Sequence, residues 1–189
     1  MNFDCSPTLK IEKLPVVGKV LTGGKTIFPA GVMYGDILKG LPVADGSCAG
    51  VYSCHVLEHL SYADMKKALE NTYRILAPGG IFRVVVPDLE DAINKYKTSG
   101  EPAAAHEFMR STLLGYANRP DGLIARIRSV FGNSNHLWMY DYHSLELELK
   151  NAGFKKIRRC RFNDSDDKAF LAVEDPSRFV DAVAIECTK

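Results

Sequence analysis

The chain has 189 residues, of which 46% are hydrophobic and 25% charged, and its 24 Lys and Arg residues nearly balance 23 Asp and Glu residues. This balance argues against a general nucleic-acid binder, because such a protein needs a basic face to neutralise phosphates. No apolar run approaches the roughly 20 residues that cross a bilayer, and the first residues lack the basic and apolar regions of a signal peptide. We therefore expect a cytosolic, cytoplasmic protein with no nucleic-acid and no membrane partner.

The length predicts one domain over residues 1–189. A core of this size buries about 70% of the surface of the unfolded chain, so the fold needs neither a metal nor a disulfide to hold it together. The cysteines are scattered and form no Cys-x-x-Cys pair, which indicates reduced thiols that act as small core residues. They are Cys5, Cys48, Cys54, Cys160 and Cys187.

From Gly31 onward, apolar runs alternate with amphipathic stretches. This pattern predicts an α/β fold with a three-layer, open, mostly parallel sheet flanked by helices. Strands are expected at 31–34, 49–54 and 81–86, and the last is nearly continuously apolar, as a central buried strand would be. Between the second and third strands, Ser61 can cap a helix over 62–76, which Pro78-Gly79-Gly80 would end. Arg83 interrupts the third strand, and we expect it to pair with an acid.

The second half of the chain predicts helices at 89–96 and 103–116 and a helical and loop insertion over 97–140. Within it, residues 118–138 follow a strand's carboxyl end and form a candidate lid or substrate loop. Its arginines (Arg119, Arg126 and Arg128) favour an acidic or phosphorylated acceptor, or else form a solvated surface. Farther on, Ser144 can cap a helix that Gly153 ends, and strands at 155–162 and 182–187 would form a C-terminal antiparallel hairpin.

An ordered set of motifs lies in the first half of the chain. The motifs are Asp36, Leu41-Pro42, Asp45-Gly46-Ser47, Val56-Leu57-Glu58-His59 and Arg74-Ile75-Leu76-Ala77-Pro78-Gly79-Gly80. In this order and spacing the chain resembles the class I S-adenosylmethionine-dependent methyltransferases, in particular the small-molecule branch. A looser resemblance continues through 138–141 and 152–154. The resemblance implies a Rossmann-like methyltransferase fold.

The resemblance also implies a cofactor site. In an open α/β sheet, ligands bind outside the carboxyl ends of the strands. In the family, the position of Asp36 contacts the adenine amino group of S-adenosylmethionine, and Ile37 offers its backbone N–H and an apolar face to the same ring. The positions of Ser53, Cys54 and His55 contact the methionine part of the cofactor or the methyl acceptor. Asp36 also fits a solvated turn residue after a strand.

His55 is the candidate catalytic residue. An imidazole near its ordinary pKa suits the removal of a proton from an acceptor hydroxyl or amine at neutral pH. A packing or orienting role fits the same position. The resemblance implies in-line methyl transfer to an O or N nucleophile of a small molecule or saccharide, driven mainly by holding donor and acceptor in line.

His55, Glu58 and His59 also match H-x-x-E-H, in which two histidines on one helix bind zinc and the glutamate acts as base. This pattern needs His55 inside a helix. The apolar run that precedes it predicts a strand, so His55 falls at a strand-to-helix junction. A zinc hydrolase is therefore the remote alternative, and we expect no metal.

The N-terminal side departs from the family. The family has a glycine-rich turn after its first strand, which lets the cofactor approach the backbone, and an acid at the end of its second strand, which holds the ribose hydroxyls. Gly18, Gly23 and Gly24 follow no convincing strand, and Glu12 stands inside the one strand candidate, residues 8–14. The elements before Asp36 would need roughly 60 residues at average lengths, more than the sequence has there. We therefore expect a fold that is truncated at its N-terminal side, with an atypical segment over 1–30.

Two functions remain open from the sequence. One is an S-adenosylmethionine-dependent methyltransferase, with a second copy or a partner chain completing the N-terminal side. The other is a degenerate methyltransferase-fold protein that binds no cofactor and serves as a binding or scaffold subunit. Cofactor binding discriminates between the two.

Overall fold

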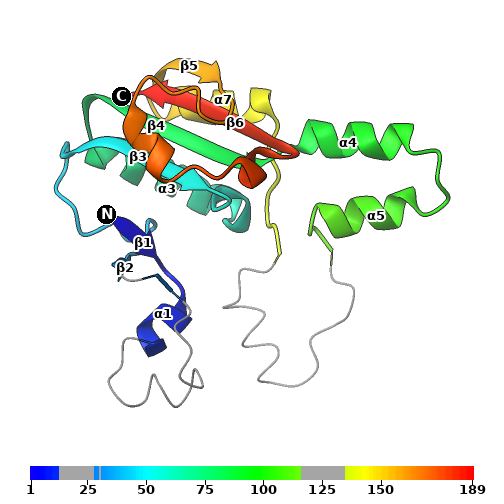
Figure 1. Ribbon diagram of the computed structural model, residues 1–189, viewed down its shortest axis with the longest axis horizontal. Helices are drawn as coiled ribbons and strands as arrows, with labels where there is room; N and C mark the ends of the chain where they lie inside the picture. The colour runs from blue at the N-terminus through cyan, green and yellow to red at the C-terminus, as the bar shows by residue number, and fades with distance from the viewer. Residues whose placement is uncertain (13–27, 30, 116–134) are drawn as a thin grey trace. The chain divides into compact units, whose positions relative to one another are not determined.

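The computed structural model describes residues 1–12, 28–29, 31–115 and 135–189 (Figure 1). The chain divides into two compact units, Met1–Ala44 and Asp45–Lys189. The glycines at 18, 23 and 24 and the arginines of the candidate lid lie outside the described residues. Within the described ranges, no helix has the length and apolar character needed to cross a membrane.

The first unit contains a strand, a helix and a second strand. They are β1 (Asn2–Asp4), α1 (Pro7–Glu12) and β2 (Val32–Tyr34). The two strands are parallel, with Asp4 opposite Tyr34. The position after β2 needs a glycine because there is no room for a larger residue. A Cβ on Gly35 would lie 2.7 Å from the Phe3 side chain and 2.8 Å from that of Leu41.

The N-terminal strand prediction was wrong. Residues 8–14 were a strand candidate, but α1 is a helix, and the strand precedes it. Two side chains favour a helix start at this point, because they satisfy backbone N–H groups there. The Asp4 carboxylate accepts from the Ser6 N–H at 2.6 Å, and the Ser6 hydroxyl accepts from the Thr8 N–H at 3.2 Å. Pro7 then occupies the first helical position, where a missing N–H costs no hydrogen bond.

The second unit is built on a four-stranded sheet. Its strands are β3 (Cys48–Cys54), β4 (Leu76–Pro87), β5 (Lys155–Arg159) and β6 (Ala182–Thr188), in the order β3-β4-β6-β5. β3 and β4 are parallel, whereas β6 is antiparallel to both β4 and β5. The predicted antiparallel pair at the end of the sheet is therefore confirmed, as is the buried central strand, since the side chains from Phe82 to Val86 are buried.

Helices and short 3-10 turns connect these strands (Figure 1). They are η1 (Leu57–His59), α3 (Tyr62–Ile75), α4 (Leu89–Thr98), α5 (Ala104–Ser111), α7 (Tyr142–Asn151), η2 (Lys168–Ala172) and η3 (Pro176–Phe179). Ser61 caps α3 as predicted, and Gly79 after it has a φ of 75°. The N-cap of α7 is Asp141 and not Ser144; Ser144 is the third helical residue and completes a capping box with Asp141.

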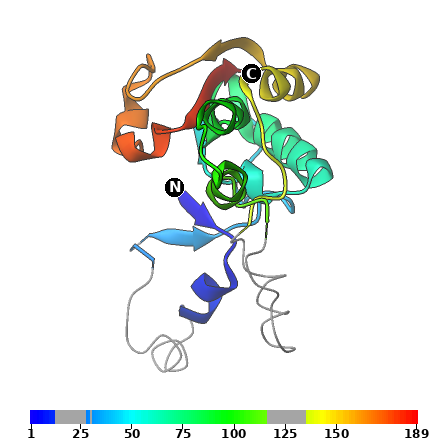
Figure 2. The same ribbon diagram turned by 90° about the vertical axis from the view of Figure 1, so that its right-hand side faces the viewer.

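Both faces of the sheet are covered. On one face, Phe82 stacks near Phe154 with ring centroids 5.4 Å apart, and Phe154 meets Tyr73 of α3 at 5.2 Å. On the other face, Val85 forms a buried cluster with Cys160 and Ala184. Figure 2 shows α4 and α5 end on. The two helices pack through the rings of Tyr96 on α4 and Phe108 on α5, whose centroids lie 5.8 Å apart.

A charged ladder crosses the sheet. Arg83 on β4 stands opposite Glu186 on β6, which in turn stands opposite Arg158 on β5. Arg83 has no exposed side-chain surface, and its guanidinium contacts Glu174, the Asp164 carboxylate at 3.0 Å and the Glu186 carboxylate at 3.0 Å. The prediction that Arg83 pairs with an acid is confirmed. These acids are partly or fully buried, and the positive charge of Arg83 compensates their negative charges there.

Arg83→Met is expected to lower the free energy of unfolding by about 3–5 kcal/mol, because it leaves buried carboxylates without their counter-charge. Arg158→Met is the matched control, and its loss should be about 1 kcal/mol or less because that side chain is partly exposed. Urea unfolding of the full chain measures both. Equal losses in the two variants would contradict the central place given to Arg83.

Candidate functional site

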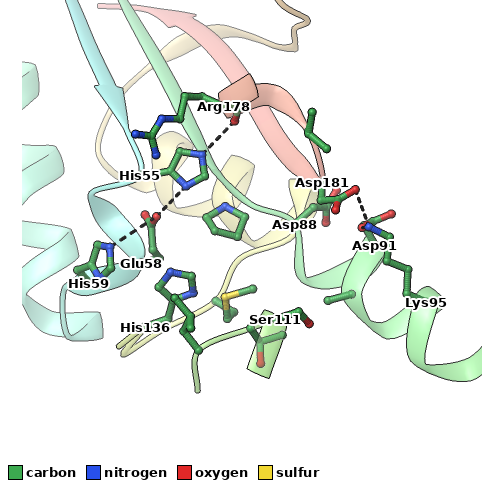
Figure 3. Close-up of a pocket in the computed structure, with 16 residues that line it drawn as sticks. His55, Glu58, His59, Asp88, Asp91, Lys95, Ser111, His136, Arg178 and Asp181 are labelled. Atoms are coloured by element: carbon green, nitrogen blue, oxygen red, sulfur yellow. Dashed lines mark hydrogen bonds and ion pairs between the residues drawn. The ribbon is translucent and has the colours of Figure 1, made fainter. Parts of the chain in front are cut away.

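A cavity of about 500 Å³ opens beside the carboxyl ends of β3 and β4 (Figure 3). Its lining includes His55, which directly follows β3, Asp88, which directly follows β4, and Glu58, His59 and His136. The carboxyl ends of parallel strands are the ordinary place for a ligand site in an open α/β sheet. The size suits a small-molecule ligand.

His55 is held in a strained backbone conformation. Its φ is 53°, in the left-handed region, and its N–H donates to the Val85 carbonyl at 2.9 Å. Its Nε2 lies 3.0 Å from the Arg178 carbonyl oxygen and its Nδ1 lies 3.2 Å from Glu58 Oε1. Both neighbours are acceptors, so the ring satisfies both when each nitrogen carries a proton. The contact with Glu58 accordingly raises the pKa of His55, against an opposing effect of burial.

Glu58 is a buried carboxylate at the centre of the site. Its side chain has no exposed surface, and neither carboxylate oxygen has a hydrogen-bond partner of good geometry among the described residues. Its backbone carbonyl is well satisfied, because it accepts from the N–H groups of Leu137 at 2.7 Å and Trp138 at 3.2 Å. The backbone of Glu58 is therefore held by η1 and by the segment at 137–138, and its side chain lines the cavity.

Two further histidines face this carboxylate. His59 Nδ1 lies 3.1 Å from the Asn135 carbonyl oxygen, and its Nε2 lies 4.0 Å from Glu58 Oε1. The rings of His59 and His136 meet edge to face, with centroids 5.0 Å apart. Burial lowers the pKa of His136, and its Nδ1 has no partner among the described residues. One ligand atom from each of Glu58, His59 and His136 lies within 4.8 Å of the others.

Sequence reasoning did not single out His136. It lies far along the chain from Glu58, and a lone histidine in a polar stretch carries no spacing signal. The backbone brings it in: its N–H donates to the Leu113 carbonyl at 3.1 Å, and the next two residues are bonded to Glu58. Only the folded structure reveals that His136 belongs to the site.

The other predicted site residues lie elsewhere. Cys54 packs against the core cluster of Val85, and burial raises the pKa of its thiol. Ser53 pairs with Val84 in the β3–β4 ladder and, like Cys54, does not line the cavity. Asp36 and Ile37 belong to the first unit, so the joint cofactor site of these residues with His55 stays a prediction.

The first unit supplies an acid that the sequence analysis missed. Asp4 ends β1, and Asp36 stands two residues beyond the end of the parallel strand β2. Partial desolvation raises the pKa of the Cys5 thiol, and the negative charges of Asp36 and Asp4 raise it further. Asp36 also accepts a hydrogen bond from the Leu38 N–H of the following turn at 3.0 Å. Carboxylates that follow the ends of two paired parallel strands can accept hydrogen bonds from the hydroxyl and amine donors of a nucleoside.

The H-x-x-E-H stretch does not form the helical zinc-peptidase arrangement. His55 follows the strand β3, and the 3-10 turn η1 begins only at Leu57. His55 and His59 therefore do not share a helix face, as the sequence predicted.

The family comparison bears on the first half of the chain. Residues 19–84 match the family model described as a methyltransferase domain. The matched range covers most of the motif series, from Asp36 to the strand that follows Gly80. The predicted resemblance to class I methyltransferases is confirmed. No curated protein matches the chain.

Solved structures are similar at low identity. A possible exported protein from Bordetella parapertussis is 14% identical over 99% of this chain and 52% of its own, with a TM-score of 0.50. A SAM-dependent methyltransferase from Archaeoglobus fulgidus is 15% identical over 84% and 67%, with a TM-score of 0.44. A SAM-dependent methyltransferase from Thermotoga maritima, a possible histamine N-methyltransferase, is 15% identical over 92% and 69%, with a TM-score of 0.46. The chain thus spans about half the length of the Bordetella protein, with which it shares a fold.

Within this methyltransferase-like chain, Cys54 is expected to behave as an unactivated thiol. The thiolate is the reactive form, and burial holds Cys54 in the thiol form at neutral pH. Iodoacetamide should therefore modify Cys54 more slowly in the native protein than in the same protein unfolded in urea, as followed by peptide mass spectrometry. Faster modification in the native state would indicate an activated nucleophile at the end of β3.

Proposed function

We propose that this protein is an S-adenosylmethionine-dependent methyltransferase that acts on an O or N nucleophile of a small molecule or saccharide. The observation that carries the proposal is the methyltransferase-domain match over residues 19–84, together with a small-molecule cavity at the carboxyl ends of β3 and β4. A methyltransferase implies a methyl acceptor, and the cavity is the candidate site for it. A cytosolic location and a second copy or partner chain at the N-terminal side remain predictions.

The cofactor supplies an electrophilic methyl group when bound. In the proposal, Asp36 accepts from the adenine amine, and Ile37 packs against the adenine ring and offers its N–H to it. Asp4 accepts from the ribose hydroxyls, because it stands at the end of the strand paired with β2. Ser53 and Cys54 would contact the methionine part through their backbone at the end of β3, and His55 would contact it from its place next to the cavity, with the Cys54 thiol neutral and therefore no nucleophile.

Holding the acceptor in line with the methyl group supplies most of the rate in this proposal. His55 lines the cavity and orients the acceptor. Its predicted action as a base requires one ring nitrogen to leave its present partner, either the Arg178 carbonyl or Glu58. Positioning is accordingly the main task of the protein, and proton removal is secondary.

Titration calorimetry of the full chain with S-adenosylmethionine and S-adenosylhomocysteine tests the proposal, and we expect saturable binding of both. Asp36→Ala and Asp4→Asn should each raise the dissociation constant by about 10-fold or more, the loss of one hydrogen bond to a charged group. The exposed Asp166→Ala is the control and should bind as the parent does.

The two aspartate variants test the position of the adenosine pocket. Binding by the parent chain with unchanged affinity in both variants would show that the pocket lies elsewhere. No binding at millimolar ligand would remove the enzyme proposal and leave the degenerate binding or scaffold subunit.

A further inference from the structure

We propose that Glu58, His59 and His136 form a binding site for one divalent transition-metal ion. The motifs and the family resemblance assign no metal, and the site differs from the H-x-x-E-H pattern because Glu58 is a ligand and His136 comes from a distant part of the chain. Figure 3 shows the three side chains converging on one point beside the cavity. The proposal stands apart from methyl transfer, since it rests only on these side chains.

The distances suit one ion after a small adjustment. The ligand atoms lie within 4.8 Å of one another, and His59 Nε2 is 4.0 Å from Glu58 Oε1. Two atoms bound at about 2.0–2.1 Å to one tetrahedral zinc ion lie about 3.3–3.4 Å apart. Ligation therefore draws ligand atoms that are up to 4.8 Å apart together by about 1.5 Å at most, which rotation of these side chains can supply.

The carboxylate of Glu58 is incompletely paired. Glu58 has no exposed side-chain surface, and its oxygens have no partner of good geometry among the described residues. A buried carboxylate without compensation is strongly disfavoured. His55 offers one contact at 3.2 Å on Oε1, which leaves Oε2 without a partner in the described part of the chain. A dication bound by the same carboxylate supplies a second positive contact beside the His55 ring.

The surrounding groups orient the two imidazoles as metal ligands. Metal-binding histidines ordinarily donate their other ring N–H to a carbonyl or carboxylate, which fixes the tautomer. His59 Nδ1 faces the Asn135 carbonyl at 3.1 Å, so Nε2 keeps its lone pair toward Glu58. The Nδ1 atom of His136 is buried and without a partner in the described residues, so it is available to a ligand. Backbone bonds from 136, 137 and 138 hold this segment against Leu113 and Glu58.

Two imidazoles and one carboxylate favour zinc, iron(II), cobalt or nickel over magnesium or calcium, which prefer oxygen ligands. Such a ligand set leaves coordination positions free. All three residues line the cavity, so these positions would face a molecule bound there. A hydroxyl or amine in the cavity is the class of ligand that would occupy them.

Cobalt(II) absorption of the untagged full chain tests the site, because the visible bands report protein ligation directly. One equivalent of Co²⁺ should produce these bands, and Zn²⁺ should displace them. Glu58→Gln, His59→Ala and His136→Ala should each weaken Co²⁺ binding by about 100-fold or more, at least the loss that second-shell changes cause. The exposed His106→Ala and His143→Ala are the matched controls and should bind as the parent does.

Glu58→Gln keeps the shape of the side chain, and circular dichroism of each variant establishes that it is folded. Parent protein without ligand-field bands at millimolar Co²⁺ would overturn the proposal. Equal weakening in the control variants would also overturn it, because binding would then be adventitious. Loss confined to the three variants, in chains that still fold, supports it.

Discussion

The environment of one buried carboxylate organises the second unit. Glu58 stands on the short turn after β3, where its side chain has no exposed surface and faces three imidazoles. Its backbone carbonyl binds the chain at 137–138, and that segment leads to Tyr140, whose carbonyl accepts from the first N–H of α4. One residue thus links the ends of β3 and β4 to a segment far along the sequence. The cavity exists because these three parts meet there.

The other ionic group of the unit has the opposite character. Arg83 is surrounded by carboxylates from β6 and from the segment between β5 and β6, so its charge is compensated many times over. Glu58 faces the rings of His55, His59 and His136, and only His55 approaches its carboxylate within 3.2 Å. Removing one member of a complete buried ion network leaves its partners unpaired and destabilises the fold, whereas an incompletely paired buried charge next to a cavity is a candidate for ligand binding. This contrast directs attention to Glu58 as the functional group.

The sequence predicted the elements that depend on local patterns. The β4 strand and the helix α3 followed from a β-branched run and from Ser61 with its amphipathic spacing, and the structure has both. The three-residue strand β1 was missed because it is too short for a periodicity, and with it the acid Asp4. The α7 cap was misplaced because Asp141 and Ser144 are both good caps, and only the geometry of the capping box separates them.

The site was predicted less completely than the fold. His55 directly follows β3, as the apolar run before it predicted, and it lines the cavity, whereas its role toward cofactor or acceptor stays a prediction. Cys54 and Ser53 belong to the same motif, but strand alternation turns the Cys54 side chain into the core. His136 reaches the site only through backbone hydrogen bonds between distant segments, which no local pattern encodes.

Anomalous diffraction at the zinc edge, from crystals of the full chain grown with one equivalent of Zn²⁺, tests the central claim most directly. We expect one strong peak within bonding distance of a Glu58 carboxylate oxygen, His59 Nε2 and a ring nitrogen of His136. A peak at surface residues alone, or none near Glu58, would contradict it.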